Sequence, residues 1–130
     1  YTASCLKHSG YWREIAASVP DIEWIARWPT EHCGNIPDSE TFAKWFWQQD
    51  FEDVSRADVV LVFAEQSDNL RGALVEAGIG IALHKRVMVV GKHHSYGTWQ
   101  YHPAVVRVDN MDQAIETLRL YARFGIHHFN

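Results

Sequence analysis

The chain has 130 residues, with 12 Lys and Arg against 16 Asp and Glu, so its formal net charge is −4. This length predicts a single domain, residues 1–130, and leaves no room for a second one. The acidic balance argues against a nucleic-acid polymer as partner, because such proteins neutralise many phosphates, and favours a small molecule. The composition, 47% hydrophobic and 22% charged, excludes a disordered or fibrous chain.

Membrane and disulfide classes are disfavoured as well. The longest apolar stretch, residues 57–64, is interrupted by Asp58 and is too short to cross a bilayer. Cys5 and Cys33 show no CxxC spacing and predict neither a disulfide framework nor a zinc ribbon. No secretory leader is recognised, so we expect a cytoplasmic protein without membrane attachment.

Strands and helices are predicted to alternate along the chain. Short β-branched apolar runs are typical of strands buried in a parallel sheet, and apolar residues at helical spacing indicate helices. In chain order we expect a strand end at 1–3, a helix at 10–18, a weaker strand at 22–26, a long helix at 39–56 capped by Asp38 or Ser39, a buried strand at 57–64, a helix at 72–83, a strand at 86–91, an edge strand at 104–108 and an amphipathic helix at 111–124.

This alternation predicts an α/β fold, a three-layer α/β/α sandwich around a mostly parallel, flavodoxin- or Rossmann-like sheet of five strands. Ligands of such sheets bind at the carboxyl ends of the strands. We therefore expect the site to be built from three loops, residues 4–12, 65–71 and 92–102. The third loop is long and rich in His, Tyr and Trp, which favours a binding role.

Glu76 is the strongest candidate for chemistry. It is the only charged residue between Gly72 and Leu83, in the first turns of a helix that leaves the ligand edge of the sheet. The positive end of the helix dipole would keep its carboxylate ionised, as a nucleophile must be. The structural alternative is a Glu that only satisfies backbone amides at the helix start.

Asp50 is the second candidate, because it lies four residues from both Phe46 and Val54 on the apolar side of the long helix. Asp53 competes for the same role, and a partly exposed acid near a helix end is the structural alternative. Two carboxylates that converge on one sugar suit cleavage of a glycosidic bond.

Two motifs carry a family resemblance. Residues 50–63 read D-F-E-D-V-S-R-A-D-V-V-L-V-F, and residues 71–91 read R-G-A-L-V-E-A-G-I-G-I-A-L-H-K-R-V-M-V-V-G. Together they resemble the nucleoside 2-deoxyribosyltransferase superfamily, which includes deoxynucleoside 5′-monophosphate N-glycosidases and CMP-type hydrolases. The positions that match are Asp50, Asp58, Gly72, Glu76, Gly78, Ala82 and Lys85, with Gly80 where Ala is usual, and Tyr1 to Cys5 fit the family's first strand and loop.

The resemblance implies roles for three residues. Glu76 would attack C1′ of the sugar, Tyr1 would orient Glu76 through its hydroxyl, and Asp50 would protonate the leaving base or activate the acceptor. It also implies a small-molecule nucleoside or nucleotide substrate, no cofactor, and assembly as a homodimer or higher homo-oligomer.

The predicted loops also offer substrate contacts. Arg71 can clasp a phosphate, although Asp68 nearby would repel one, so nucleoside and 5′-monophosphate both remain open. Trp12 can stack on a base and His102 can contact a base or a phosphate. The full set of expected binding residues is Ser4, Lys7, Trp12, Arg71, Gly72 and His102.

Several alternatives stay open or are disfavoured. Transfer of the sugar to a second base and transfer to water are not distinguished, and a non-catalytic nucleotide-binding module on the same fold is the main alternative. A phosphoribohydrolase lacks its P-G-G-x-G-T-x-x-E motif here, and an NAD-dependent oxidoreductase lacks G-x-G-x-x-G. The adjacent pairs His93–His94 and His127–His128 do not have the spacing of a metal site.

Overall fold

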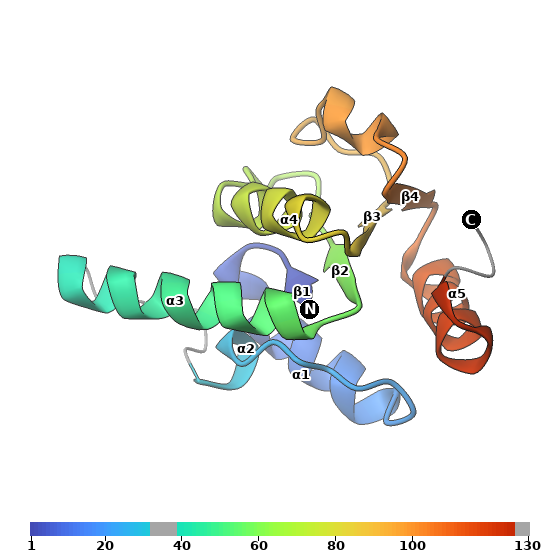
Figure 1. Cartoon of the computed structure of the whole chain (residues 1–130), viewed down its shortest axis with the longest axis horizontal. Coiled ribbons are helices and arrows are strands. Elements are labelled where there is room, and N and C mark those ends of the chain that lie inside the picture. Colours follow the sequence, from blue (N-terminus) through green and yellow to red (C-terminus); the bar gives the residue numbers. More distant parts are fainter. Residues whose placement is uncertain (32–38, 127–130) are drawn as a thin grey trace.

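The structure, a computed structural model, describes residues 1–31 and 39–126. Within these residues the chain forms a four-stranded, fully parallel sheet in the order β1-β2-β3-β4. The strands are β1 (Thr2–Ala3), β2 (Val59–Val62), β3 (Arg86–Val90) and β4 (Val105–Val108) (Figure 1). Cys33, Asp38, His127 and His128, which entered the sequence predictions, lie outside the described residues.

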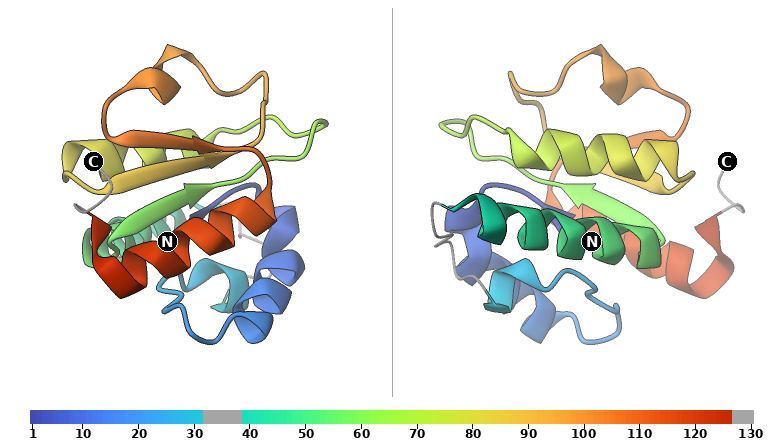
Figure 2. Two further views of the ribbon diagram at one scale, coloured as in Figure 1. Left: turned by 90° about the vertical axis from the view of Figure 1, so that its right-hand side faces the viewer. Right: turned by 60° about the vertical axis from the view of Figure 1, so that its left-hand side comes forward.

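Helices cover both faces of this sheet. Figure 1 shows α3 (Glu40–Arg56) and α4 (Gly72–Ala82) on one side and α5 (Met111–Phe124) on the other. Figure 2 shows α1 (Ser9–Ser18) and α2 (Trp28–Glu31) at the β1 end of the sheet. Two 3₁₀ turns, η1 (Leu6–His8) and η2 (Thr98–Tyr101), complete the described elements. The predicted three-layer α/β/α class is confirmed.

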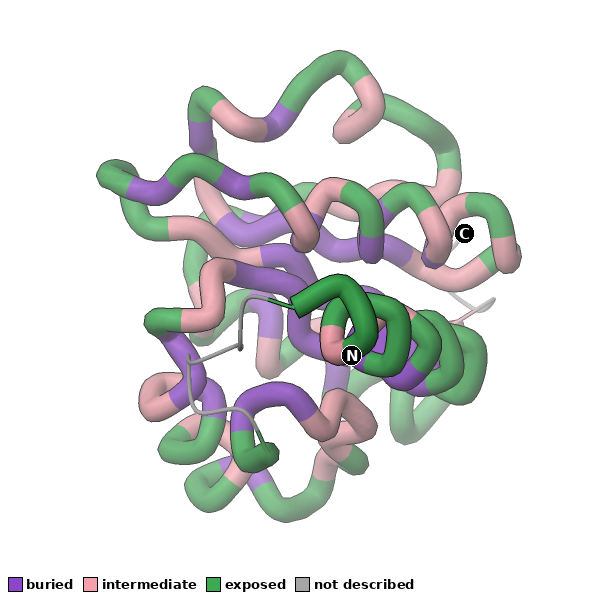
Figure 3. Tube along the Cα trace, turned by 90° about the vertical axis from the view of Figure 1, so that its left-hand side faces the viewer, coloured by how far each residue is buried: buried purple, intermediate pink, exposed green. Residues whose placement is uncertain are grey.

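The central strands are buried because helices pack on both of their faces. Val60 and Val62 of β2 and Val87 and Val89 of β3 are fully buried, as the short β-branched apolar runs predicted. Burial on α3 is one-sided: its buried residues face the sheet, and its outer face is exposed (Figure 3). None of the helices described is long and apolar enough to cross a membrane.

The predicted strand at residues 22–26 is wrong, so the sheet has one strand fewer than expected. Residues 23–27 form no regular element. The indole of Trp24 donates to the carbonyl oxygen of Val19 at 2.9 Å, and the backbone N–H of Arg27 donates to Asp53 Oδ2 at 3.0 Å. These contacts satisfy local groups in a loop, where the alternating apolar residues pack against the core without pairing with β1.

Local capping explains where the long helices start. Ser39 Oγ accepts a hydrogen bond from the N–H of Phe42 at 3.0 Å, so Ser39 is the cap of α3. Asn110 caps α5 in the same way through Gln113. Arg71, at the start of α4, makes no side-chain cap, although its carbonyl oxygen accepts from the N–H of Leu74 at 3.1 Å.

Candidate active site

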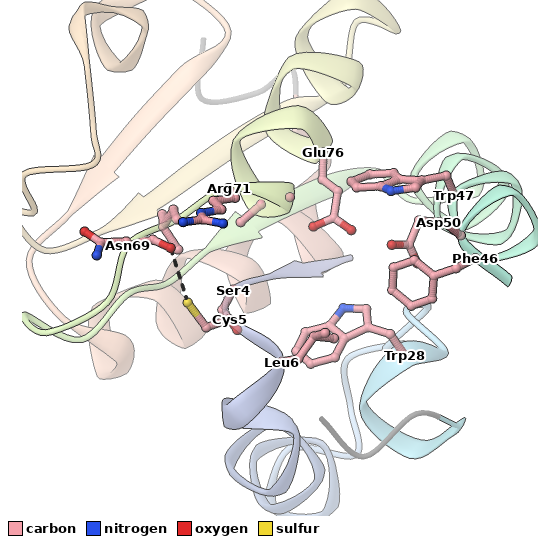
Figure 4. Close-up of a pocket in the computed structure, with 14 residues that line it drawn as sticks. Ser4, Cys5, Leu6, Trp28, Phe46, Trp47, Asp50, Asn69, Arg71 and Glu76 are labelled. Atoms are coloured by element: carbon pink, nitrogen blue, oxygen red, sulfur yellow. Dashed lines mark hydrogen bonds between the residues drawn. The ribbon is translucent and has the colours of Figure 1, made fainter. Parts of the chain in front are cut away.

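The two predicted carboxylates meet at one cavity. Glu76 of α4 and Asp50 of α3 are 5% and 1% exposed, and Figure 4 shows their carboxylates pointing toward one another. The cavity has a volume of about 310 Å³. It is lined by Ser4, Cys5, Leu6, Trp28, Ala43, Phe46, Trp47, Asp50, Asn69, Leu70, Arg71, Gly72, Ala73 and Glu76.

A close approach of α3 and α4 brings these carboxylates together. The two helices pack against each other on the same face of the sheet. At Gly72 a Cβ atom would lie 3.3 Å from Cη2 of Trp47, so the missing side chain leaves room for the indole ring. The first turn of α4 therefore lies directly beside α3, and Glu76, one turn later, faces Asp50.

Tyr1 joins this pair from the sheet. Its hydroxyl donates a hydrogen bond to Oε2 of Glu76 in a buried contact. Burial, followed by the negative charges of Glu76 and Asp50, raises the pKa of the Tyr1 hydroxyl well above its usual value. The hydroxyl therefore stays protonated and donates to one oxygen of Glu76, which leaves Oε1 for another partner.

The pKa of Glu76 is raised well above its usual value. Burial is the largest cause, and hydrogen bonding and charge repulsion from Asp50 act in the same direction, while the Tyr1 hydroxyl opposes them. These effects outweigh the helix dipole, which we expected to keep Glu76 ionised. Because two buried carboxylates this close resist double ionisation, the pair retains a proton.

Asp53, the competitor of Asp50, has a structural role. Its side chain is fully buried, and Oδ1 lies 2.9 Å from Nε and 2.7 Å from a terminal nitrogen of Arg27. Asp53 is not among the residues that line the cavity. Its charge is thus used to anchor the loop before α2, and Asp50 is the acid of α3 that faces Glu76.

Aromatic side chains form one wall of the cavity. Trp28, Phe46 and Trp47 line it, and the rings of Phe46 and Trp47 meet edge to face with centroids 6.1 Å apart. Phe46 was not among the predicted site residues. The spacing of Ala43, Phe46 or Trp47, and Asp50 along one helix face was the signal that would have revealed this wall.

Three of the six predicted binding residues line the cavity, namely Ser4, Arg71 and Gly72. The other three do not. Lys7 forms an ion pair with Asp68 at 2.7 Å. Trp12 is 2% exposed and its indole donates to Ser4 Oγ at 2.6 Å, so it positions a lining residue from behind. His102 lies between η2 and β4, where its Nδ1 accepts from the N–H of Ala104 at 3.0 Å.

A second polar cluster lies beside the cavity. Among the described residues, His8, Glu65 and Asp68 place possible metal-ligand atoms within 4.8 Å of one another. The ammonium of Lys7 lies 2.7 Å from Asp68 Oδ1, and its positive charge balances the negative charge of this carboxylate. His93 uses both ring nitrogens within the protein, since Nε2 donates to the carbonyl oxygen of Glu65 and Nδ1 accepts from the N–H of Ser95.

Comparisons with known proteins find similarity among solved structures. No family model matches the sequence, and no curated protein sequence matches it either. The structure of the CMP N-glycosidase BcmB from Clostridium botulinum superimposes with a TM-score of 0.55 at 12% identity, over 92% of this chain and 98% of that one. The chain therefore shares the fold of this CMP N-glycosidase, the fold that the sequence resemblance implies.

Proposed function

We propose that the chain is an enzyme of the nucleoside 2-deoxyribosyltransferase superfamily that cleaves the N-glycosidic bond of a (deoxy)nucleoside or nucleoside 5′-monophosphate. The observation that carries this proposal is the meeting of Glu76 and Asp50 at the cavity, with the Tyr1 hydroxyl bound to Glu76. The cavity volume of about 310 Å³ lies at the small end of the range of ligand pockets and suits one compact ligand. The fold shared with a CMP N-glycosidase supports the same class of reaction.

The chemistry divides into two steps. In the first, Oε1 of Glu76 attacks C1′ while the C1′–N bond breaks, and the proton held by the carboxylate pair passes through Asp50 to the leaving base. Tyr1 holds Oε2 and so fixes the direction of attack. In the second step, water or another base attacks C1′, the bond to Glu76 breaks, and Asp50 takes the proton of the incoming group.

The aromatic wall suits the base of such a substrate. Trp47 is half-buried, lines the cavity, and extends its ring from α3 toward the first turn of α4 (Figure 4). A planar base can stack on an indole or phenyl face with a gain of about 1–3 kcal/mol. We therefore expect the base to contact this wall and the sugar to lie between the two carboxylates.

The rim of the cavity also carries groups that suit a 5′-phosphate. Arg71 lies at the cavity rim, and the first N–H groups of α4 have no side-chain cap. Asp68, which counted against a phosphate in the sequence analysis, is bound by Lys7 and His8, so its charge is compensated. Both substrate forms therefore belong in the test.

The test is chromatographic release of free base from a panel of ribo- and deoxyribonucleosides and their 5′-monophosphates, with and without a second base. Glu76→Gln is the inactive variant and Glu116→Gln, on the exposed face of α5, is the matched control. Release by the wild type and by Glu116→Gln but not by Glu76→Gln would support the proposal. A new nucleoside would identify a transferase, and free sugar a hydrolase.

The opposite result is equally specific. If a nucleotide binds and no base is released, the catalytic proposal fails and the non-catalytic binding module replaces it. Binding is followed by quenching of tryptophan fluorescence, since Trp28 and Trp47 line the cavity.

We further propose a homo-oligomer, in which α3 contributes to the subunit interface. Trp45 and Phe51, large apolar residues on this helix, are 47% and 50% exposed. Light scattering of the wild type and of Phe51→Glu tests this, because a monomer in both cases would contradict it. A cytoplasmic location and the lack of a cofactor stay predictions.

A further inference from the structure

Asp68 is a buried carboxylate outside the cavity lining that binds three groups from two loops. Its side chain is 0% exposed. Oδ1 lies 2.7 Å from Nζ of Lys7, and Oδ2 accepts from Nε2 of His8 at 2.7 Å and from the N–H of Glu65 at 2.8 Å. The carboxylate is thus held through both oxygens, Oδ2 by two hydrogen bonds and Oδ1 by the close ion pair with Lys7.

These contacts join the loops that follow β1 and β2. Lys7 and His8 belong to η1, whose first residue, Leu6, lines the cavity together with Ser4 and Cys5. Asp68 directly precedes the lining residues 69–73. A further hydrogen bond between these two segments, from Cys5 Sγ to the carbonyl oxygen of Asn69 at 3.9 Å, is weak.

The loop after β2 is supported from its other side by the loop after β3. Nε2 of His93 donates to the carbonyl oxygen of Glu65 at 2.8 Å, and the N–H of Leu70 donates to Ser95 Oγ at 3.2 Å. The third loop, which we expected to line the site, therefore supports it from behind. Asp68 provides the opposing attachment, toward β1.

We propose that Asp68 is a positioning residue, which sets the separation of lining residues 4–6 and 69–73 and thereby the affinity of the cavity for its ligand. Its carboxylate acts through Lys7, His8 and the Glu65 N–H, and contacts no substrate. The catalytic part of this inference rests on the function proposed above, whereas the effect on the loops does not.

Asp68→Asn tests this proposal, because it keeps the shape of the side chain and removes its charge. With the substrate identified in the panel, we expect KM to rise about tenfold, the equivalent of one charge-assisted hydrogen bond, while kcat changes much less. Hydrogen–deuterium exchange should become faster in residues 65–71. Glu116→Gln, an exposed carboxylate removed in the same way, should leave both unchanged.

Lys7→Met is the second variant, because Lys7 is 56% exposed and its loss leaves the other two contacts in place. We expect a smaller rise in KM, and the double variant should be no worse than Asp68→Asn alone, since both changes remove one interaction. Fully additive effects would mean that Lys7 contacts the substrate directly and would overturn the proposal.

The remaining outcomes are equally decisive. A folded Asp68→Asn with unchanged KM and exchange would overturn the inference, and so would a lower kcat at unchanged KM. If Asp68→Asn does not fold, Lys7→Met decides: unchanged KM and exchange in that variant overturn it. If the wild type releases no base, the proposed function fails, and exchange in residues 65–71 alone decides whether Asp68 holds the loops.

Discussion

The hydroxyl of Tyr1 donates a hydrogen bond to Oε2 of Glu76, a residue 75 positions further along the chain. The contact exists because β1 pairs in parallel with β2, and α4 returns across the same strands. Tyr1 therefore binds Glu76 from the sheet, without itself lining the cavity. The start of β1 and the helix α4 together hold the carboxylate of Glu76 in position.

Removing this hydroxyl should slow the reaction. We expect Tyr1→Phe to lower kcat for base release about tenfold, because Glu76 loses the donor that orients it and stabilises its charge. Single-turnover measurement of base release checks this without interference from product release. An unchanged rate in a folded Tyr1→Phe protein would show that Glu76 is oriented by its other neighbours.

The raised pKa of Glu76 predicts how stability depends on pH. The native state holds this proton more tightly than the unfolded chain, in which the pKa is about 4.5. The resulting stabilisation is complete below that pH and is lost as pH rises through the native pKa. We expect the free energy of unfolding to fall over this range in the wild type and to fall less in Glu76→Gln, as measured by urea denaturation at a series of pH values. Parallel curves would contradict a raised pKa.

Asp68 should show the opposite pH dependence. Burial alone would raise its pKa, but hydrogen bonds from Lys7, His8 and the Glu65 N–H lower it to about 2, from 3.8. The stabilisation is therefore present above pH 3.8 and is lost as pH falls toward about 2. Asp68→Asn should not show this loss of stability as pH falls. Acid unfolding measures it, and identical acid transitions in the wild type and Asp68→Asn would argue against a lowered pKa of Asp68.

Two glycines of α4 provide a matched test of its packing. A Cβ on Gly80 would lie 2.8 Å from Cγ2 of Val60, whereas a Cβ on Gly78 would meet nothing within 4 Å. Gly80→Ala should destabilise the protein by about 1–3 kcal/mol through overpacking. Gly78→Ala should stabilise it by about 0.5–1 kcal/mol through helix propensity. Urea denaturation measures both, and equal effects would contradict the close packing of α4 on the sheet.

The fold was largely predictable because local signals agree with the tertiary structure. The apolar runs around Val60 and Val87 predict buried parallel strands, and Ser39 and Asn110 act as caps where the helices begin. Residues 22–26 were misassigned because alternation of apolar residues also occurs in a loop whose polar groups bind side chains such as Asp53. Periodicity does not tell whether a segment finds a neighbouring strand.

The site was predictable where its residues sit on regular elements. Glu76 and Asp50 stood out as charged residues on apolar helix faces, and both reach the cavity. His102 was also predicted, but it does not line the cavity. The cavity is lined by the loops after β1 and β2, and the loop after β3 lies behind the second of these. Which loop lines a cavity depends on strand order and helix position, and neither is encoded locally.

Ala43, Phe46, Trp47 and Asp50 all reach the cavity from a single helix, α3. A helix moves as a stiff rod, so any tilt of α3 would shift the aromatic wall and the acid by linked amounts. A larger ligand that pushes this wall outward would therefore also draw Asp50 away from Glu76 and weaken their mutual repulsion. The position of the aromatic wall and the separation of the two carboxylates thus depend on the same helix.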